Sequence, residues 1–167
     1  MIVLASLILI TFGPSESRWQ VVNDGVMGGV SKSRMTLTDE GTGLFEGTLS
    51  LENNGGFASV RTMVNEPKLA DYQGLEIKVR GDGRTYQLRL RMDRNLDGVA
   101  YMTPFETEAE TWTTVRLPFA AFEPTFRGRR VPNAPALDPA RVKQVSLLLA
   151  DGTPGAFAIE VEWVRTY

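Results

Sequence analysis

Two strand patterns of different kinds stand together in VSLLLADGTPGAFAIEVEWV, residues Val145 to Val164. The first six residues are apolar on both faces, the pattern of a central strand that is covered on both sides. After the Asp151-Gly152 turn, apolar residues alternate with small or acidic ones from Phe157 to Trp163. This period of two indicates a strand with one face in a core and the other toward water or a ligand. The stretch therefore predicts a β-protein.

The same alternation continues outward through the chain, and amphipathic helical runs of useful length are missing. We expect further strands over 31–37, 44–51, 57–63, 75–80, 86–92, 99–105 and 112–117. Only Phe119–Phe122 and Pro139–Val142 have helical character, about one turn each. The least regular segment is the long connection Glu123–Asp138. Roughly nine to eleven short strands joined by Asp-Gly and Asn-Gly turns predict an all-β fold, an antiparallel β-sandwich of jelly-roll topology.

Composition limits the classes of function. The 167 residues suit one domain, and 18 basic against 20 acidic residues give a net charge of −2. No general attraction to nucleic acid follows from that balance. The chain has no cysteine and no histidine, which excludes disulfides, thiolate nucleophiles, His-based triads and His- or Cys-ligated metals. An enzyme would have to use carboxylates, Lys, Tyr or a carboxylate-bound hard metal. We expect no enzyme and no cofactor.

The N-terminal segment has two interpretations. Residues Met1 to Phe12 read MIVLASLILITF, an uncharged apolar run too short to cross a bilayer as a helix. A signal peptide carries basic residues ahead of such a run, whereas the first basic residue here is Arg18. The segment is either leader-like or an apolar overhang followed by a first strand at Leu9–Phe12. Residues 1–11 are assigned to that overhang or leader-like segment and residues 12–167 to one domain.

A glycine-rich segment, WQVVNDGVMGGVS from Trp19 to Ser31, contains the first candidate site. Its glycines permit positive φ angles and close approach of another backbone. It lacks the spacing of a phosphate loop. Two interpretations stay open: a structural loop in which acidic and amide side chains bond local amides, or a contact loop with an adaptable methionine. The candidate residues are Asn23, Asp24, Met27, Gly28 and Gly29.

A basic cluster, Phe126-Arg-Gly-Arg-Arg130, lies in the long connection. One aromatic ring beside guanidinium groups suits a phosphate or an acidic protein surface. The cluster is too short to form a nucleic-acid site alone. A plain solvated loop is the alternative interpretation. Its candidate binding residues are Phe126, Arg127 and Arg129.

Two acidic patterns are interpreted as structural. Asp93 to Gly98 matches the start of a calcium loop, but Pro104 stands where the closing bidentate glutamate belongs. A polar hairpin turn without a metal is expected there. Glu160 and Glu162 are two apart on one strand, so their backbones lie about 6.5 Å apart. That spacing occurs in glycosidases, whose carboxylates however stand on facing elements. We expect a solvated face balanced by Arg89 and Arg91.

Four blocks, in this order, resemble the complex I intermediate-associated protein family. They are WQVVNDGVMGGVS from Trp19, FEGTLSLENNGGFASVR from Phe45, WTTVRLPFAAFEPTFRGR from Trp112 and LLLADGTPGAFAIEVEWV from Leu147. The resemblance implies a galactose-binding-like β-sandwich similar to carbohydrate-binding modules, and a non-enzymatic role in assembly or scaffolding. Mitochondrial members carry a transit peptide, whose basic and serine-rich character is missing from residues 1–12. The residues on the family's motif positions are Asn23, Asp24, Gly25, Met27, Gly28, Gly29, Arg61, Phe126, Arg127, Gly128 and Arg129.

The resemblance and the residues together predict a monomeric protein-binding module, a chaperone or scaffold for respiratory complex subunits or assembly intermediates. A glycan-binding module is the alternative. Exposed aromatic residues usually form the platform of such modules, whereas Trp112 and Trp163 occupy positions that we expect to face the core. The protein is expected in the cytoplasm or at the periphery of the inner membrane, with the periplasm left open, and without nucleic acid or metal as a ligand.

Overall fold

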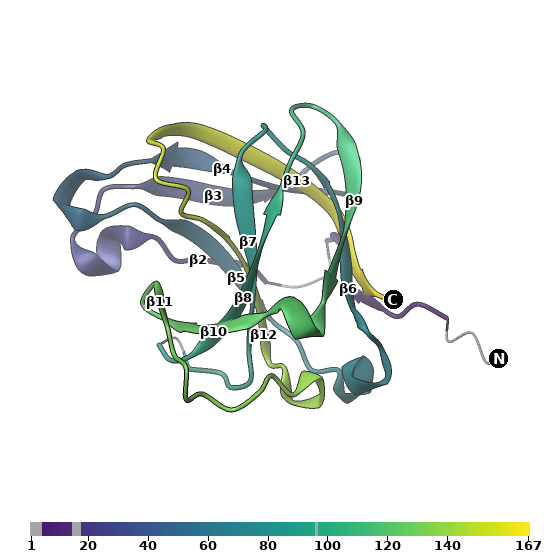
Figure 1. Ribbon diagram of the computed structural model, residues 1–167. Helices are drawn as coiled ribbons and strands as arrows, with labels where there is room; N and C mark the ends of the chain where they lie inside the picture. The colour runs from purple at the N-terminus through teal and green to yellow at the C-terminus, as the bar shows by residue number, and fades with distance from the viewer. Residues whose placement is uncertain (1–4, 15–17, 96) are drawn as a thin grey trace.

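The computed structural model describes residues 5–14, 18–95 and 97–167. Within these ranges thirteen strands form two antiparallel sheets that pack face to face as a jelly-roll sandwich (Figure 1). The predicted all-β antiparallel sandwich is therefore confirmed. Short 3₁₀ turns, rather than α-helices, occupy the connections: η1 (Asp24–Met27), η2 (Glu52–Asn54), η3 (Pro67–Asp71), η4 (Phe119–Ala121) and η5 (Pro139–Arg141).

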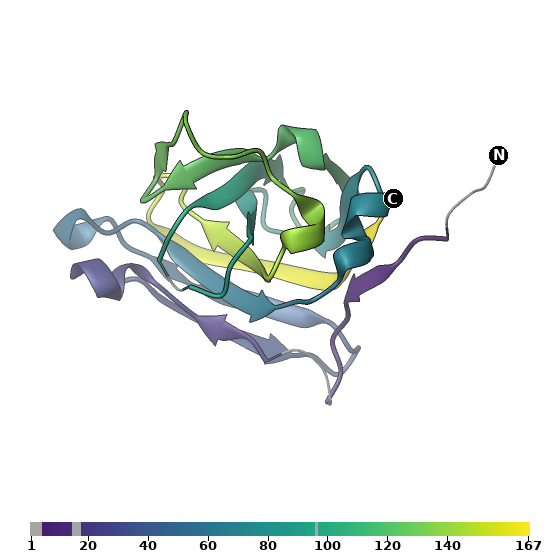
Figure 2. The same cartoon turned by 90° about the horizontal axis from the view of Figure 1, so that it is seen from below.

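The first sheet has six strands, and its longest strand lies at the centre. Its order is β3 (Lys32–Leu37), β4 (Gly43–Leu49), β13 (Gly155–Thr166), β6 (Gly74–Arg80) and β9 (Trp112–Pro118), with β1 (Ile8–Ile10) also paired to β13. Strand β1 pairs Ile8 with Arg165, which brings the start of the described chain next to its C-terminal end (Figure 2). Ile10 is buried in the core. The division into residues 1–11 and 12–167 stays a prediction, with β1 lying in the first of these ranges.

The second sheet has seven strands. Its order is β11 (Arg129–Arg130), β10 (Glu123–Phe126), β8 (Ala100–Glu106), β7 (Thr85–Arg91), β12 (Gln144–Leu149), β5 (Ala58–Met63) and β2 (Gln20–Val21). Every residue of β12 is buried and the strand lies inside the sheet, which confirms the interpretation of this stretch as a central strand, although Ala150 at its end is exposed. The core between the sheets is built on alternate residues of these strands. Phe45 and Phe157 of the first sheet meet edge to face, with ring centroids 5.1 Å apart, and Tyr86 of the second packs against Phe157.

Alternation in the sequence places most strands to within a few residues of their observed positions. The long connection 123–138, which the sequence predicts to be irregular, is the exception. It contains strands β10 and β11, which form a hairpin whose tip is Arg127-Gly128. Both tip residues have positive φ, +48° and +76°. A two-residue hairpin turn of this kind usually has the sequence Asn-Gly or Asp-Gly, so the dipeptide Arg-Gly does not predict it.

The expected inward orientation of both tryptophans is wrong. Strand β13 has a bulge between Val161 and Trp163 that shifts its alternation by one residue, so Val164 takes the inward place and Trp163 faces out. Trp112 of β9 stands opposite Arg80 of β6, and 36% of the tryptophan surface is exposed. Each ring lies under a guanidinium group: Arg165 Cζ is 4.1 Å from the Trp163 centroid and Arg80 Cζ is 5.3 Å from that of Trp112.

The expected balance of Glu160 and Glu162 by Arg89 and Arg91 is also wrong. The glutamates lie on β13 and the arginines on β7, which belong to different sheets. Glu160 instead pairs with Arg80 across 2.5 Å, and Glu162 pairs with Lys78 across 2.6 Å. Alternation shows which residues face outward, but it does not show which sheet their strand joins.

Candidate functional site

The glycine-rich loop is organised around one buried carboxylate. Asp24 has no exposed surface, and its oxygens accept hydrogen bonds from Ser31 N at 3.0 Å, Ser31 Oγ at 2.6 Å and Gly56 N at 2.7 Å. Burial opposes ionisation, but these hydrogen bonds outweigh it and hold the pKa of Asp24 below its usual range. Because Ser31 precedes β3 and Gly56 precedes β5, Asp24 links the two sheets.

The neighbouring glycines make room for that carboxylate. A Cβ on Gly29 would lie 2.4 Å from Asp24 Cγ, and one on Gly55 would lie 2.5 Å from its Oδ2. Gly28 adopts a φ of +88°, which favours glycine. Asn23 has a similar task, since its Oδ1 accepts hydrogen bonds from Ser33 Oγ at 2.7 Å and from Ser59 N at 3.3 Å. These four candidate residues, Asn23, Asp24, Gly28 and Gly29, shape the loop from within.

The same loop presents apolar side chains outward. Val26 and Met27, in η1, are 76% and 59% exposed, and Val30 is 45% exposed. A single exposed apolar residue needs no explanation, but three within one short loop form a small apolar tip at the end of the sandwich. Of the candidates in this loop, Met27 is the one whose side chain is available to a partner.

Arg61 lies in a different environment, on the outer side of the seven-stranded sheet. Strand register places Ser146 of β12 directly between Arg61 of β5 and Arg89 of β7. In the adjacent row Gln144 lies next to Arg91. We call the outward residues Arg61, Arg89 and Arg91 the arginine face. Arg61 is buried, whereas Arg89 and Arg91 are half-buried.

The charge of the arginine face is only partly compensated. The guanidinium of Arg89 donates to Gln87 Oε1 from Nε at 3.0 Å and from Nη2 at 2.8 Å. Arg91 Nη1 donates to the carbonyl of Gly98 at 2.8 Å. Burial and the neighbouring charge of Arg91 lower the pKa of Arg89 to about 10 and also lower that of Arg61. Among the described residues, no carboxylate is ion-paired with Arg89 or Arg91.

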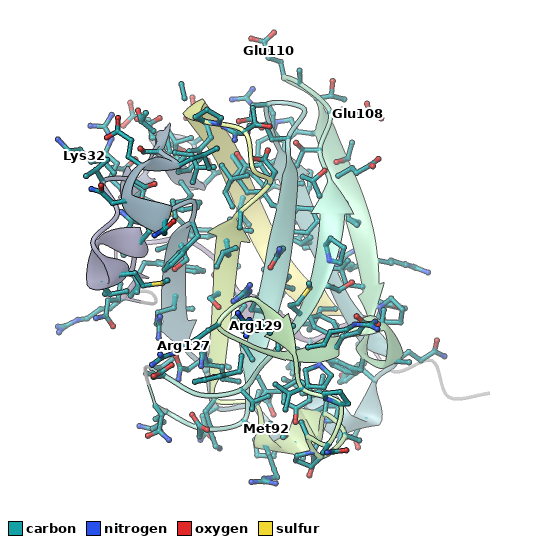
Figure 3. The ribbon with its side chains drawn as sticks, turned by 60° about the vertical axis from the view of Figure 1, so that its left-hand side comes forward. Lys32, Met92, Glu108, Glu110, Arg127 and Arg129 are labelled. Atoms are coloured by element: carbon teal, nitrogen blue, oxygen red, sulfur yellow. The ribbon has the colours of Figure 1, made fainter. Side chains whose placement is uncertain are left out.

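The β10–β11 hairpin belongs to the same side of the molecule. Figure 3 shows Arg127 and Arg129 on this hairpin in front of the seven-stranded sheet. Arg127 Nη2 pairs with Asp97 Oδ2 at 2.8 Å, and its guanidinium lies 5.1 Å from the Phe126 ring centroid. Asp97 and Gly98 adjoin, so the hairpin meets the loop that Arg91 holds. The structure thus brings Arg61, Phe126, Arg127 and Arg129 to one side, while the glycine-rich loop reaches it through Ser59, two residues before Arg61.

Sequence analysis assigned Arg89 and Arg91 to a solvated face and did not include them among the candidate binding residues. The signal was the outward residues of β5, β7 and β12, which include three arginines and no acidic residue. Recognising that these arginines share one face requires the strand order, because the three strands are far apart in the sequence. Two hollows lie away from this side: one of about 210 Å³ between Phe12, Trp19 and Leu37, and one of about 450 Å³ between Lys32, Glu46 and Phe157.

The calcium-like turn uses its oxygens internally. Asp93 Oδ1 accepts a hydrogen bond from Asn95 N at 2.9 Å, and Asp97 is paired with Arg127. The carbonyls of Asp93 and Asn95 accept from Gln144 Nε2. Leu96 lies outside the described residues, and within the described ones no three acidic side chains gather as a metal site would require. The expectation that the turn binds no calcium stays a prediction.

Comparison with known proteins identifies the family. A model of the family described as complex I intermediate-associated protein 30 matches residues 10–161. The chain belongs to this family. Relatives include the probable complex I intermediate-associated protein 30, mitochondrial, of Caenorhabditis elegans, 26% identical over 83% of the chain and 46% of the relative. The Drosophila melanogaster protein of that name is 25% identical over 88% and 57%. The chain thus spans about half the length of these relatives.

Solved structures agree on the fold. The family 11 carbohydrate-binding module of Clostridium thermocellum, solved in complex with a β-1,3-1,4-mixed-linked tetrasaccharide, aligns with 99% of the chain and 96% of the module at a TM-score of 0.70. Sequence identity is 12%, so this likeness extends to the fold alone. A family 30 carbohydrate-binding module covers 98% of the chain at a TM-score of 0.54. Over its described residues the chain has no helix of the length and hydropathy needed to cross a bilayer.

Proposed function

We propose that this chain is a non-enzymatic binding module that holds protein subunits or intermediates during assembly of respiratory complex I, as a scaffold or chaperone. The observation that carries the proposal is the family match over residues 10–161. Curated relatives named complex I intermediate-associated protein support it. We place its action in the cytoplasm or at the periphery of the inner membrane, where it binds its partners as a monomer.

The surface chemistry supports contact with protein. Methionine, arginine and aromatic residues are enriched in interfaces, and arginine is frequent among the residues that dominate binding energy. Met27 at the apolar tip, and Phe126 with Arg127 and Arg129 on the hairpin, offer these residue types at exposed positions. The absence of histidine and cysteine from the sequence removes the commonest catalytic side chains.

A glycan-binding module is the second candidate, because a structural neighbour was solved with a tetrasaccharide. Sugar rings bind by stacking on open aromatic faces in sites of that kind. Here the outward residues of β5, β7 and β12 include no aromatic ring. Trp112 and Trp163 face outward from the other sheet, but a guanidinium covers each ring. These contacts make protein the better-supported ligand.

A tagged pull-down from native respiratory membranes tests the proposal. We expect the wild-type chain to recover complex I subunits and the variants Met27→Ala and Arg127→Ala to recover less, with unchanged melting temperatures because both side chains are exposed. Leu37→Ala and Arg34→Ala alter equally exposed residues elsewhere and serve as matched controls. Recovery of no complex I protein by the wild type, or binding of a mixed-linked β-glucan in its place, would contradict the proposal.

A further inference from the structure

The arginine face is an expensive arrangement that the fold itself does not require. Burying a guanidinium removes its hydration, and placing a second one nearby adds repulsion. Arg61 and Arg89 both experience these two effects, the second from Arg91. A neutral side chain at any of the three positions would avoid the cost. Perturbed ionisable groups on a surface therefore indicate a binding role.

The acidic residues beside the face are already engaged. Asp97 is held by Arg127 and Glu123 by Arg130, both from the β10–β11 hairpin. Arg89 donates two of the five N–H groups of its guanidinium to Gln87 Oε1, which fixes the orientation of the guanidinium. The remaining N–H groups of Arg89 have no protein acceptor among the described residues. Arg129, at the hairpin, likewise has no carboxylate within ion-pair distance in the described part of the chain.

We propose that the arginine face binds an extended acidic segment of a protein partner, whose carboxylates Arg89 and Arg91 take together. Two residues apart on one strand, Arg89 and Arg91 lie about 6.8 Å apart along β7, and Arg61 lies about 9.6 Å across the sheet from Arg89. An extended peptide with acidic residues at every second position repeats its carboxylates at the first of these spacings. Guanidinium groups bind carboxylates through paired N–H donors.

The surroundings favour a peptide over a sugar or a small anion. Met102 of β8 stands beside Arg89, and the exposed Met63 lies on the same side of the sheet. Thioether groups next to arginines suit the side chains of a polypeptide rather than a sugar ring. The whole chain is slightly acidic, with a net charge of −2, so the basic face is a local feature. This inference rests on the proposed protein-binding function and names the chemistry of its partner.

The test titrates the 167-residue chain with a short peptide of alternating glutamate and threonine, and calorimetry measures the binding. The same peptide with glutamine in place of glutamate, inorganic phosphate and a mixed-linked glucan tetrasaccharide are the comparison probes. We expect the wild type to bind the glutamate peptide in preference to all three, with affinity that falls as salt is added. Arg89→Gln and Arg91→Gln should each weaken binding by about tenfold or more, the loss expected for a charged hydrogen-bonded pair. Arg34→Gln, an exposed arginine of the other sheet, should leave it unchanged.

Equal binding of the glutamate and glutamine peptides by the wild type, which needs no variant, would overturn the inference. So would phosphate or glucan bound as well as the glutamate peptide, or unchanged affinity in Arg89→Gln and Arg91→Gln. The membrane pull-down separates this inference from the proposed function. If Arg89→Gln recovers as much complex I protein as the wild type, the inference fails and the proposed function stands. If the wild type recovers none, the proposed function fails and the peptide titration alone decides the inference.

Discussion

On the six-stranded sheet Arg80, Arg116 and Arg165 each face a glutamate, whereas on the seven-stranded sheet Arg89 and Arg91 face serine, glutamine and methionine. We call the first arrangement the ion-paired face; its acidic members are Glu76, Glu160 and Glu162. Glu76 is 4% exposed and takes both Arg116 at 3.1 Å and Arg165 at 2.5 Å. Burial opposes its ionisation, but the two guanidinium groups outweigh that and hold the pKa of Glu76 below its usual range.

The difference shows that arginine has two uses on one scaffold. On the ion-paired face each positive charge is neutralised within the sheet, so the face contributes to stability and has little electrostatic attraction left for a ligand. On the arginine face burial raises the cost of positive charge at Arg89. Among the described residues no carboxylate forms an ion pair with Arg89 or Arg91, although the charges of Asp93 and Asp97 partly offset that of Arg91. Proteins accept such local destabilisation where a surface has to bind. The contrast fits a structural task for the ion-paired face and the binding task that we propose for the arginine face.

The largest expected effect on the free energy of unfolding comes from Asp24, whose hydrogen bonds link the two sheets. Replacing Asp24 by Ala leaves the buried donors of Ser31 and the half-buried N–H of Gly56 without their acceptor, so we expect the free energy of unfolding to fall by about 3 kcal/mol or more. Urea denaturation measures this, with Asp39→Ala in an exposed turn as the control. A loss below about 1 kcal/mol would show that the loop is not held by Asp24, and would return that residue to the candidates for direct binding.

A pair of neutralising substitutions tests the comparison itself. Glu76→Gln leaves Arg116 and Arg165 without a charged partner, and we expect a loss of about 1 to 2 kcal/mol, kept small because both arginines also reach solvent. Arg89→Gln removes a buried charge that has no acidic partner, so the free energy of unfolding should change by less than about 0.5 kcal/mol or rise. Equilibrium denaturation of both variants is the measurement. A larger loss in Arg89→Gln than in Glu76→Gln would reverse the assignment of tasks.

How far the sequence predicts this molecule depends on whether a feature is local. Period-two alternation locates the long strands because each strand's inward residues are written in order, as in Tyr86, Leu88 and Leu90. The bulge that turns Trp163 outward adds one residue to the strand without a sequence signal. The hairpin tip Arg127-Gly128 lacks the usual turn dipeptides. The arginine face depends on β12 inserting between β5 and β7, a pairing between segments far apart in the chain, which alternation does not encode.

Both faces should gain stability as pH rises, but in separate pH ranges, the ion-paired face in acid and the arginine face in alkali. The lowered pKa of Glu76 means that the unfolded chain binds protons more tightly there, so its stabilising contribution is present above the unfolded pKa and lost as pH falls through the folded one. Burial lowers the pKa of Arg89 from its usual high value to about 10. Above that value the folded form releases a proton that the unfolded form retains, and the cost of burying the charge disappears.

Unfolding free energies of the wild type and the two variants across pH detect this. The difference between wild type and Glu76→Gln should shrink as the solution is acidified from about pH 6 to about pH 3. Any stability that Arg89→Gln gains over the wild type should shrink as pH rises through about 10, where wild-type Arg89 also loses its charge. Parallel curves for Arg89→Gln and the wild type over the alkaline range would mean that Arg89 is not desolvated, and the contrast between the faces would weaken.

The smallest expected effect concerns calcium at the turn beside the arginine face. A bound cation between Asp93 and Asp97 would add positive charge next to Arg91 and make its loop a metal site, which would break the comparison. The oxygens are already used: Asp97 pairs with Arg127, Asp93 caps its own turn, and the Asp93 and Asn95 carbonyls accept from Gln144. We therefore expect millimolar calcium to leave the melting temperature unchanged. Ligand at a hundredfold its dissociation constant stabilises a fold by about 2.7 kcal/mol, an effect that thermal denaturation resolves easily. A rise in melting temperature with calcium, abolished in Asp93→Ala, would establish a calcium site at this turn. The comparison between the two faces would then fail, because the turn beside Arg91 would bind a cation.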